Sequence, residues 1–268
     1  SSGEIVREFS YSDEVLACDI SPDGSLLASG GRDNKVTIRD LRTGEVRAEI
    51  AKAGEVRSVA FAPGGTLLAS GGTDQKVEVT ELDGSLVGSF PHADDVNGVA
   101  WAPSGLLLAS GGRDSKVVLR DTAKWKPVTR IGRGAGLASD DEVFFVGFSP
   151  DSSLLVSGGH DEKTTLRDAL SGEELREIPH GGSVYAASFF PQGGVLASAG
   201  ADKQVVLSDV ETGRPLRRLR HLDEVYAVAV SPNGLWVATG GRDRRLRVYD
   251  VRTLGLMPPP SPPPPSLS

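Results

Sequence analysis

The sequence predicts an all-β fold, a six-bladed β-propeller of four-stranded antiparallel blades. Three observations lead to it: a pattern that recurs six times, apolar residues in short alternating runs, and 33 glycines among 268 residues. Glycine favours the tight turns between short strands because it adopts positive φ angles at little cost. The 38% hydrophobic and 24% charged residues are typical of an ordered domain. A chain of this length can bury a core without a metal or a disulfide.

The repeat is marked by a proline in a turn and by an aspartate eleven residues later. Successive prolines are 41, 40, 47, 41 and 41 residues apart. The prolines are Pro22, Pro63, Pro103, Pro150, Pro191 and Pro232, and the aspartates are Asp33, Asp74, Asp114, Asp161, Asp202 and Asp243. One unit of this length cannot bury its own strands, so neighbouring units must stack. Radial stacking of such sheets gives a β-propeller.

Short apolar runs inside each unit are bounded by turn residues. In the second unit the runs are 56–61, 67–69 and 77–79, and the turns are 62–65, 71–72 and 83–84. Runs of this length predict strands and hairpins. No stretch carries the 3.6-residue period of a helix over a convincing length. The unit therefore reads as a small antiparallel sheet.

The unit resembles the WD repeat in its length, its SPDG-like turn, its ASGG segment followed by Asp, and the acid that ends its third strand. The acids are Asp40, Glu81, Asp121, Asp168, Asp209 and Asp250. The resemblance covers residues 3–251 and implies a non-catalytic scaffold that binds other proteins. The family's Trp before the acid is absent from every copy. Its place is taken by Arg39, Thr80, Arg120, Arg167, Ser208 and Tyr249.

The resemblance also implies a buried hydrogen-bonded network in three units, made of a His, a Ser or Thr, and the repeat Asp. The three sets are His92, Ser110 and Asp114; His180, Ser198 and Asp202; and His221, Thr239 and Asp243. These residue types recur at equivalent positions, which indicates a structural role in each blade. A satisfied buried network stiffens a fold and specifies its register.

Two domains are expected, a propeller over residues 1–253 and a proline-rich tail over 254–268. Residues 2–9 resemble the fourth strand of a unit, matching residues 171–178, and the last unit stops after its third strand. We therefore expect the N-terminal strand to close the last blade. The alternative is that the chain is part of a seven-bladed propeller. The tail, extended as polyproline II, is either solvated or docked on an aromatic groove of another protein.

Net charge and composition limit the classes of partner and the location that we expect. The net charge of -7 makes nucleic acid an unlikely partner, because such a chain repels a phosphate backbone. The sequence has no run of 18 apolar residues, so no membrane span is predicted. Residues 1–10 lack the features of a signal peptide. A cytoplasmic location is expected, with organelles left open. The single cysteine, Cys18, aligns with four valines and one alanine and is expected to be a small core residue.

We expect neither an enzyme nor a metal or cofactor site. Zinc needs ligands that converge on one point, whereas the three repeated histidines fall in three different units. Phosphate-binding glycine loops are absent. Most acids repeat from unit to unit, and Asp19 is an exception, standing where other units carry Ala, Gly or Ser.

The resemblance places two positions of each unit on the rim of the central channel, the residue after the first Val and the residue before the repeat Asp. The rim candidates for binding a protein or peptide are Phe144, Tyr185, Tyr226, Arg57, Asn97, Arg32, Arg113 and Arg242. Aromatic and Arg side chains are frequent in interface hot spots. The alternative is that the three rings only cover the blade ends. The acids before the first Val are expected to pair with the rim arginines inside each blade.

Two further features adjoin these surfaces. The longer loop 132–141 is expected to wall the rim site, and Trp125 is expected on the opposite face. A structural subunit of a larger multiprotein assembly without a dedicated pocket is the alternative function. A propeller hydrolase is the second alternative.

Overall fold

The computed structural model describes residue 5 and residues 7–132 and 141–256, which form 23 strands in six antiparallel sheets. Each sheet is one blade, and the blades are numbered here along the chain. This all-β architecture is consistent with a six-bladed β-propeller. In the part of the chain so described, no helix is long and apolar enough to cross a membrane. The tail beyond residue 256 and most of the loop 132–141 lie outside the described residues.

The first three blades each have four strands in sequential order. Blade 1 contains β1 (Val15–Ile20), β2 (Leu26–Gly31), β3 (Lys35–Asp40) and β4 (Val46–Ala51). Blade 2 contains β5 (Val56–Phe61), β6 (Leu67–Gly72), β7 (Lys76–Glu81) and β8 (Leu86–Pro91). Blade 3 contains β9 (Val96–Trp101), β10 (Leu107–Gly112), β11 (Lys116–Asp121) and β12 (Lys126–Gly132).

The next two blades repeat this order, and the last has three strands among the described residues. Blade 4 contains β13 (Val143–Phe148), β14 (Leu154–Gly159), β15 (Lys163–Asp168) and β16 (Glu174–Pro179). Blade 5 contains β17 (Val184–Phe189), β18 (Val195–Gly200), β19 (Gln204–Asp209) and β20 (Pro215–Arg220). Blade 6 contains β21 (Val225–Val230), β22 (Trp236–Gly241) and β23 (Leu246–Asp250), followed by the 3-10 helix η1 (Val251–Leu254).

The SPDG turn between β1 and β2 shows why the repeat keeps these residues. Gly24 has a φ of 72°, which a residue with a side chain rarely adopts. Asp23 accepts hydrogen bonds from the hydroxyl of Ser21 and from the backbone N–H of Ser25. These bonds lower the pKa of Asp23 to about 2, so the carboxylate stays charged and holds the turn closed at neutral pH.

Hydrophobic cores lie between blades, where the third strand of one sheet packs on the first strand of the next. In the first of these cores, Val36 and Ile38 of β3 pack with Val56, Val59 and Phe61 of β5. Burying each such aliphatic side chain contributes about 1.5–3 kcal/mol. The alternating apolar positions of the repeat are therefore the contacts that join the blades.

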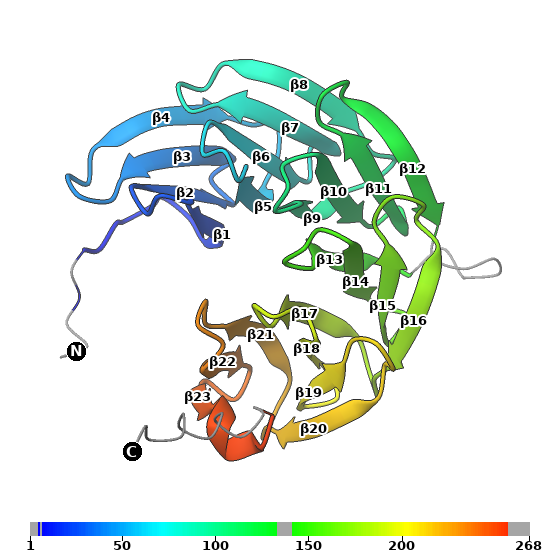
Figure 1. Cartoon of the computed structure of the whole chain (residues 1–268). Coiled ribbons are helices and arrows are strands. Elements are labelled where there is room, and N and C mark those ends of the chain that lie inside the picture. Colours follow the sequence, from blue (N-terminus) through cyan, green and yellow to red (C-terminus); the bar gives the residue numbers. More distant parts are fainter. Residues whose placement is uncertain (1–4, 6, 133–140, 257–268) are drawn as a thin grey trace, which may run out of the picture.

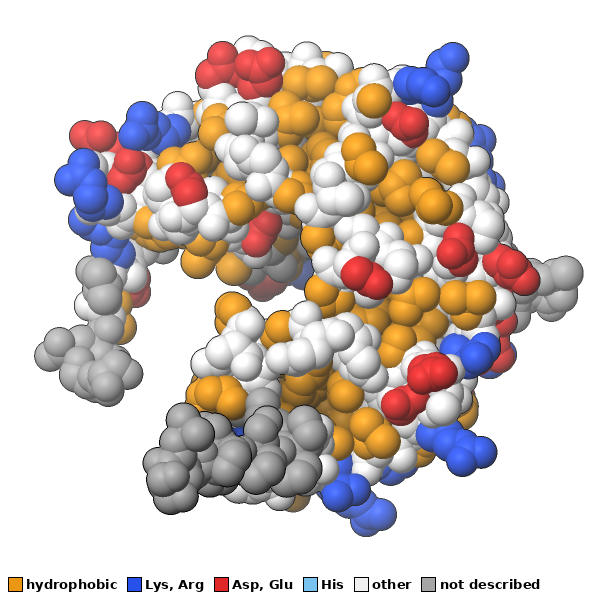
Figure 2. Space-filling model, viewed as in Figure 1, with side chains coloured by type: hydrophobic (Ala, Val, Ile, Leu, Met, Phe, Trp, Pro, Cys, Tyr) orange, Lys and Arg blue, Asp and Glu red, His pale blue; other side chains and the backbone are white. Residues whose placement is uncertain are grey.

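The six sheets form an arc that is open between β1 and the last sheet (Figure 1). Side chains of the described residues do not fill this opening, which leads into the centre of the molecule (Figure 2). Residues 7–11 lie against blade 1, where Arg7 donates hydrogen bonds to the carbonyl oxygens of Leu41 and Arg42. Among the described strands none pairs with the outer edge of β23. Closure of the last blade by the N-terminal strand therefore stays a prediction.

Cys18 lies on the first strand of blade 1 and is exposed, so the expectation of a core position is wrong. Its counterparts Val59, Val99 and Val228 are buried. The difference arises because a preceding blade covers each counterpart, whereas β1 borders the opening (Figure 1).

Candidate protein-interaction site

A β-bulge follows the first valine of every first strand. In each blade the pairing register with the second strand shifts by one residue at this point. The residues left unpaired are Leu16, Arg57, Asn97, Phe144, Tyr185 and Tyr226, and we call them the rim row. A bulge bends the strand and re-aims the side chain of the extra residue. The backbone thus turns one side chain per blade away from the regular pleat.

The three aromatic members of the rim row touch one another across blades 4, 5 and 6. The ring centroids of Phe144 and Tyr185 are 5.6 Å apart, and those of Tyr185 and Tyr226 are 5.3 Å apart. Both separations lie in the range that aromatic pairs favour. Tyr226 is 47% exposed. The structure thus joins the three candidate rings into one continuous aromatic surface.

The polar members of the rim row link blades 2, 3 and 4. Arg57 donates to the side-chain oxygen of Asn97 at 2.8 Å and pairs with Asp95 at 3.1 Å. Asn97 in turn donates to the backbone oxygen of Val143, next to the first aromatic ring, at 3.0 Å. The rim row therefore runs without interruption from Arg57 to the tyrosines, with two polar residues followed by three aromatic ones.

Tyr185 has a partner for its hydroxyl, which donates to Glu224 at 3.3 Å. Burial, together with the negative charge of Glu224, raises the pKa of Tyr185. The phenol therefore remains a hydrogen-bond donor at neutral pH. This bond fixes the middle ring of the aromatic surface.

Two rim arginines pair inside their own blades, as the alignment of acids and bases predicts. Arg32 lies 3.0 Å from Glu14, and Arg242 lies 3.1 Å from Glu224. Arg32 also approaches Glu55 of the next blade at 3.7 Å. All these side chains are partly solvated, and such pairs contribute about 0–1 kcal/mol each.

The third rim arginine pairs mainly across blades, which differs from the expected pairing inside each blade. Arg113 lies 2.8 Å from Glu142 of blade 4 and 3.8 Å from Asp95 of its own blade. The neighbouring blade competes because the first strands lie side by side around the channel.

The His92 side chain is buried between a hydroxyl and a carboxylate. Its Nδ1 lies 3.2 Å from Asp114 and its Nε2 lies 2.8 Å from Ser110. Because the carboxylate can only accept, Nδ1 carries the proton and Nε2 accepts from the hydroxyl. The bonds from His92 and from the backbone N–H of Ala93 outweigh burial and lower the pKa of Asp114. These bonds tie the end of blade 2 to blade 3.

Blades 5 and 1 have a contact to the repeat serine that is equivalent to the one between His92 and Ser110. His180 lies 2.9 Å from Ser198 and 3.4 Å from Asp202. In blade 1 the hydroxyl of Tyr11 is 2.7 Å from Ser29. Sequence reasoning missed Tyr11, although its spacing of 18 residues from the serine is that of the histidines. A search by spacing rather than by residue type finds it.

Blade 6 arranges its histidine differently. Arg247 donates to Nδ1 of His221 at 2.7 Å, so Nε2 carries the proton and faces Thr239 at 3.3 Å. Asp243 pairs with Arg247 at 2.7 Å. The aspartate thus reaches the histidine through an arginine. Burial and the charge of Arg247 lower the pKa of His221, which keeps the ring neutral.

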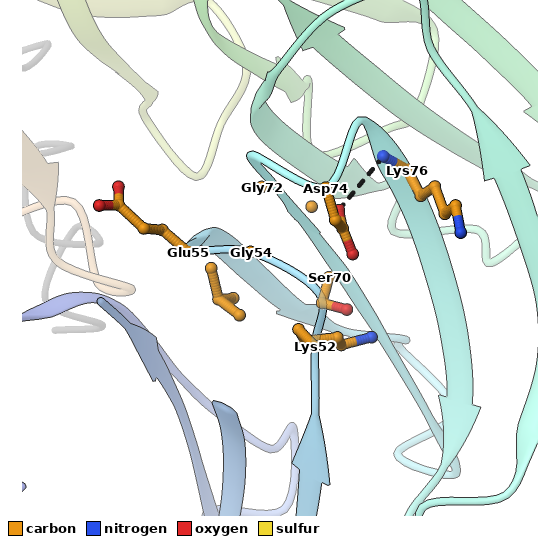
Figure 3. A pocket seen from close by; sticks show the side chains of 9 residues that line it. Lys52, Gly54, Glu55, Ser70, Gly72, Asp74 and Lys76 are labelled. Carbon is orange, nitrogen blue, oxygen red and sulfur yellow. Dashed lines mark hydrogen bonds between the residues drawn. The ribbon is translucent and has the colours of Figure 1, made fainter. Parts of the chain in front are cut away.

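In blade 2 a lysine stands where other blades have histidine. Lys52 extends past Ser70, and Asp74 turns to the backbone N–H of Lys76 (Figure 3). The side chain of Lys52 is only 4% exposed and lies 2.5 Å from Glu78. The small pocket that Lys52, Ser70 and Asp74 line has no room for a water molecule. Blade 2 therefore replaces the hydrogen-bonded network by a buried ion pair.

Arginines at the position of the missing Trp stack on aromatic rings. The guanidinium of Arg120 lies 4.4 Å from the ring centre of Phe90, and that of Arg39 lies 5.1 Å from that of Phe9. A guanidinium over a ring face is stabilised by the charge distribution of the ring. Each stack joins a blade to the segment that precedes it.

Trp125 is partly buried and packs against the core between blades 2 and 3. It stacks on Phe90 at 5.6 Å and meets the edge of Trp101 at 6.1 Å.

Within the described residues, no group of three or more His, Cys, Asp or Glu side chains could hold a metal ion.

Asp19 serves as an interblade contact, since it accepts a hydrogen bond from the backbone N–H of Phe61 at 2.7 Å. Ser188 makes the same contact to Val230 between blades 5 and 6. Burial raises the pKa of Asp19 despite its bonds to backbone N–H groups. The native state therefore holds this proton more tightly than the unfolded chain does.

The Asp19→Asn variant is expected to gain stability at neutral pH. A group with a raised native pKa stabilises the fold at low pH and loses this contribution as the pH rises through that pKa. The amide keeps the acceptor for Phe61 without a charge, so we expect the melting temperature to rise by about 1–2 °C at pH 7. At pH 3 the two proteins should melt together. A gain of the same size at both pH values contradicts this account.

One family model, described as WD domain, G-beta repeat, matches residues 3–40, 46–79, 84–121, 134–166, 172–209 and 213–250. No protein in the curated collection matches the chain. WD repeats generally mediate protein–protein interactions as scaffolds, and proteins built from them are generally non-catalytic. Six matches over most of the chain, together with six antiparallel sheets, establish that the chain belongs to the WD-repeat family.

Proposed function

We propose that the chain is a non-catalytic scaffold that binds a protein or peptide through the rim row. The observation that carries the proposal is the continuous aromatic surface of Phe144, Tyr185 and Tyr226. Rings already held against one another lose little conformational freedom on binding, and they bury a large area. Adjacent Arg57 and Asn97 offer polar groups that orient a partner.

The rim arginines Arg32, Arg113 and Arg242 belong to the proposal as the charged border of this surface. Their ion pairs are exposed, so a partner can exchange them at small cost. Charges at such a border steer association and set specificity more than they add affinity. A partner within a multiprotein complex and a cytoplasmic location remain predictions.

A structural subunit without a dedicated pocket is the second candidate. The open arc favours it, because apolar side chains of the two end sheets are exposed at the opening. The two candidates differ in whether binding depends on the aromatic surface.

Replacing the three rings by alanine is expected to remove a rim-bound partner. Hot-spot aromatics contribute about 2 kcal/mol or more, which corresponds to about 30-fold in affinity. The measurement is affinity purification from native extract with the wild-type chain and the Phe144→Ala/Tyr185→Ala/Tyr226→Ala variant side by side, followed by titration of the captured partner.

The matched control is Trp236→Ala, which also removes an exposed aromatic ring. Trp236 is the first residue of β22, whereas Tyr226 lies beside the last residues of that strand, Gly240 and Gly241. Circular dichroism of both variants checks that the fold is intact. Partners that the triple variant loses and the control keeps support the rim. Partners kept by both variants contradict the rim proposal and favour the structural subunit.

A further inference from the structure

Arginine side chains are concentrated in blades 5 and 6. Residues 210–256 contain nine arginines and five acids, which gives a net charge of +4. Because the whole chain has a net charge of -7, the remaining residues together carry -11. A local excess of positive charge attracts an anionic ligand to that part of the surface. An anionic partner would therefore bind where these arginines are exposed and unpaired.

Blade 5 lacks an ion pair that two other blades have at their outer edge. In blades 1 and 4 a lysine of the third strand pairs with a glutamate of the fourth strand. The two pairs are Lys35 with Glu49 at 3.2 Å and Lys163 with Glu177 at 2.9 Å. At the equivalent positions of blade 5, Arg218 donates a hydrogen bond to the side-chain oxygen of Gln204 at 3.5 Å. Glutamine carries no charge, so this contact leaves the charge of Arg218 uncompensated.

Arg220 adds a second positive charge on the same side of β20. Side chains two residues apart on a strand project from the same face, and Arg218 and Arg220 are both exposed. Within the described residues, neither side chain forms an ion pair. Blades 1 to 4 have an uncharged residue at the position of Arg220, namely Ala51, Pro91, Gly132 and Pro179. Two neighbouring unpaired guanidinium groups thus distinguish blade 5 from these four blades.

The hairpin 200–204 leads from the aromatic surface toward these arginines. At its inner end, the backbone N–H of Ala201 donates to the carbonyl oxygen of Ser183 at 2.8 Å, two residues before Tyr185. Ser183 stands where the other five blades carry an acid at the rim. The acids are Glu14, Glu55, Asp95, Glu142 and Glu224. The path outward from Tyr185 along blade 5 thus has no repelling carboxylate at this repeat position.

The outer end of the same hairpin reaches the arginines. The carbonyl oxygen of Lys203 accepts from the backbone N–H of His221 at 2.8 Å, and His221 directly follows Arg220. The side chain of Lys203 is 53% exposed and pairs with Asp223 at 3.3 Å. An ion pair so exposed is weak, so a carboxylate of a partner can replace Asp223. We call the surface of Ser183, Ala201, Lys203, Arg218 and Arg220 the blade 5 strip.

The blade 5 strip has the length of a short peptide. Neighbouring strands lie about 4.8 Å apart, so the four strands of blade 5 span about 14 Å. An extended chain advances about 3.3 Å per residue, so about four or five residues cover this span. One short segment can therefore hold an apolar side chain on the aromatic surface and acidic side chains on Arg218 and Arg220.

The charge distribution favours a peptide over a nucleic acid as the occupant. A nucleic acid carries a negative charge at every phosphate, and beyond the blade 5 strip it would meet the rim acids of the other blades. A peptide confines its acids to a few residues. We infer that the partner of the rim row contains a short acidic segment, which lies along the blade 5 strip with its acidic side chains on Arg218 and Arg220. This inference rests on the proposed function and adds the chemistry of the partner.

The probes are two biotinylated peptides that differ only in charge. Each has a Trp, then about four glycines to match the blade 5 strip, then a run of glutamates in one peptide or of glutamines in the other. Binding to the chain is measured by biolayer interferometry at about 0.1 M salt, where the Debye length is about 10 Å. The wild-type chain should bind the glutamate peptide about tenfold or more tightly than the glutamine peptide. Salt at about 1 M shortens the Debye length to about 3 Å and should remove most of this difference.

Arg218→Glu is the test variant, because blades 1 and 4 have glutamate at this position and the residue therefore suits the strand. It should weaken binding of the glutamate peptide by about fivefold or more and leave binding of the glutamine peptide unchanged. The matched control is Arg214→Glu, which changes the net charge equally. Blades 1 and 4 have Glu45 and Glu173 at that position. Arg214 lies about 13 Å along the strand from Arg218, so the control should change binding by less than about twofold.

Three results would overturn the inference. Equal binding of the two peptides by the wild-type chain, or binding of neither, would exclude an acidic segment. Equal losses in Arg218→Glu and Arg214→Glu would exclude the blade 5 strip as its site. Tighter binding of a thymidine oligonucleotide with the same number of charges would assign the blade 5 strip to a nucleic acid.

The triple aromatic variant separates this inference from the rim proposal, and it should lose both peptides. If it does so while the wild-type chain binds the two peptides equally, the rim proposal holds and the acidic segment fails. If the triple variant keeps the glutamate peptide at wild-type affinity, the rim proposal fails and the inference fails with it.

Discussion

Replacing Leu207 by alanine is expected to lower the free energy of unfolding by about 2–5 kcal/mol. Leu207 is fully buried in the core between blades 5 and 6, with Val225 and Val228 of the next first strand. The substitution removes apolar contacts and leaves a cavity that a close-packed interface fills only in part. Urea denaturation followed by circular dichroism measures the loss, provided that the transition is two-state.

Val248→Ala is the matched control because it changes the same repeat position in the last blade. Val248 borders the opening and is mostly exposed, so its truncation should cost less than about 0.5 kcal/mol. The contrast between the two variants measures how far the opening between β1 and β23 is exposed in solution. A loss of stability at Val248 that equals the loss expected for a buried valine would contradict the opening between β1 and β23 and favour a closed ring.

The fold could be predicted to a large extent because each repeat encodes the same contacts. The proline spacing and the alternating valines give six sheets, and the family model matches six segments at the same places. Closure could not be decided from the repeat. Residues 2–9 have the pattern of a fourth strand in a ring of six and in a ring of seven alike. Only the geometry shows that residues 7–11 lie against blade 1.

The rim candidates were implied by the resemblance to the WD repeat, which does not explain why their side chains leave the regular pleat. The bulge at Tyr185 and its equivalents is a shift in hydrogen-bond pairing, and no residue type marks it in the sequence. The ring contacts are likewise visible only in space. Whether these side chains bind a partner stays a prediction.

Some polar contacts could not be predicted from the sequence because a different residue type stands at the repeat position that makes them. Tyr11 and Lys52 occupy the histidine position without resembling histidine, and Arg120 occupies the Trp position. Each of these residues still makes a contact between one blade and the segment that precedes it, but the contact has a different chemistry. A search for residue types finds the histidines, whereas a search for equivalent positions finds all of them.

Glu78→Val is expected to cost about 3 kcal/mol of stability, because it leaves the charge of Lys52 without its partner in a buried site. Valine is the natural residue at this repeat position in blades 3 and 5, as Val118 and Val206. Its shape therefore suits the strand, and the loss reports the unpaired ammonium group. Urea denaturation at pH 7 provides the measurement.

The double variant Lys52→His/Glu78→Val tests whether the ion pair stands in for the network of blade 3. It gives blade 2 the set that blade 3 has, a histidine beside a Ser, an Asp and a Val, with Ser70 and Asp74 as its partners. His92 makes both contacts at hydrogen-bond distance, so the double variant should recover most of the loss. A coupling of about 2 kcal/mol between the two sites is expected. If the two substitutions destabilise additively, Ser70 and Asp74 do not accept a histidine, and the ion pair is specific to blade 2.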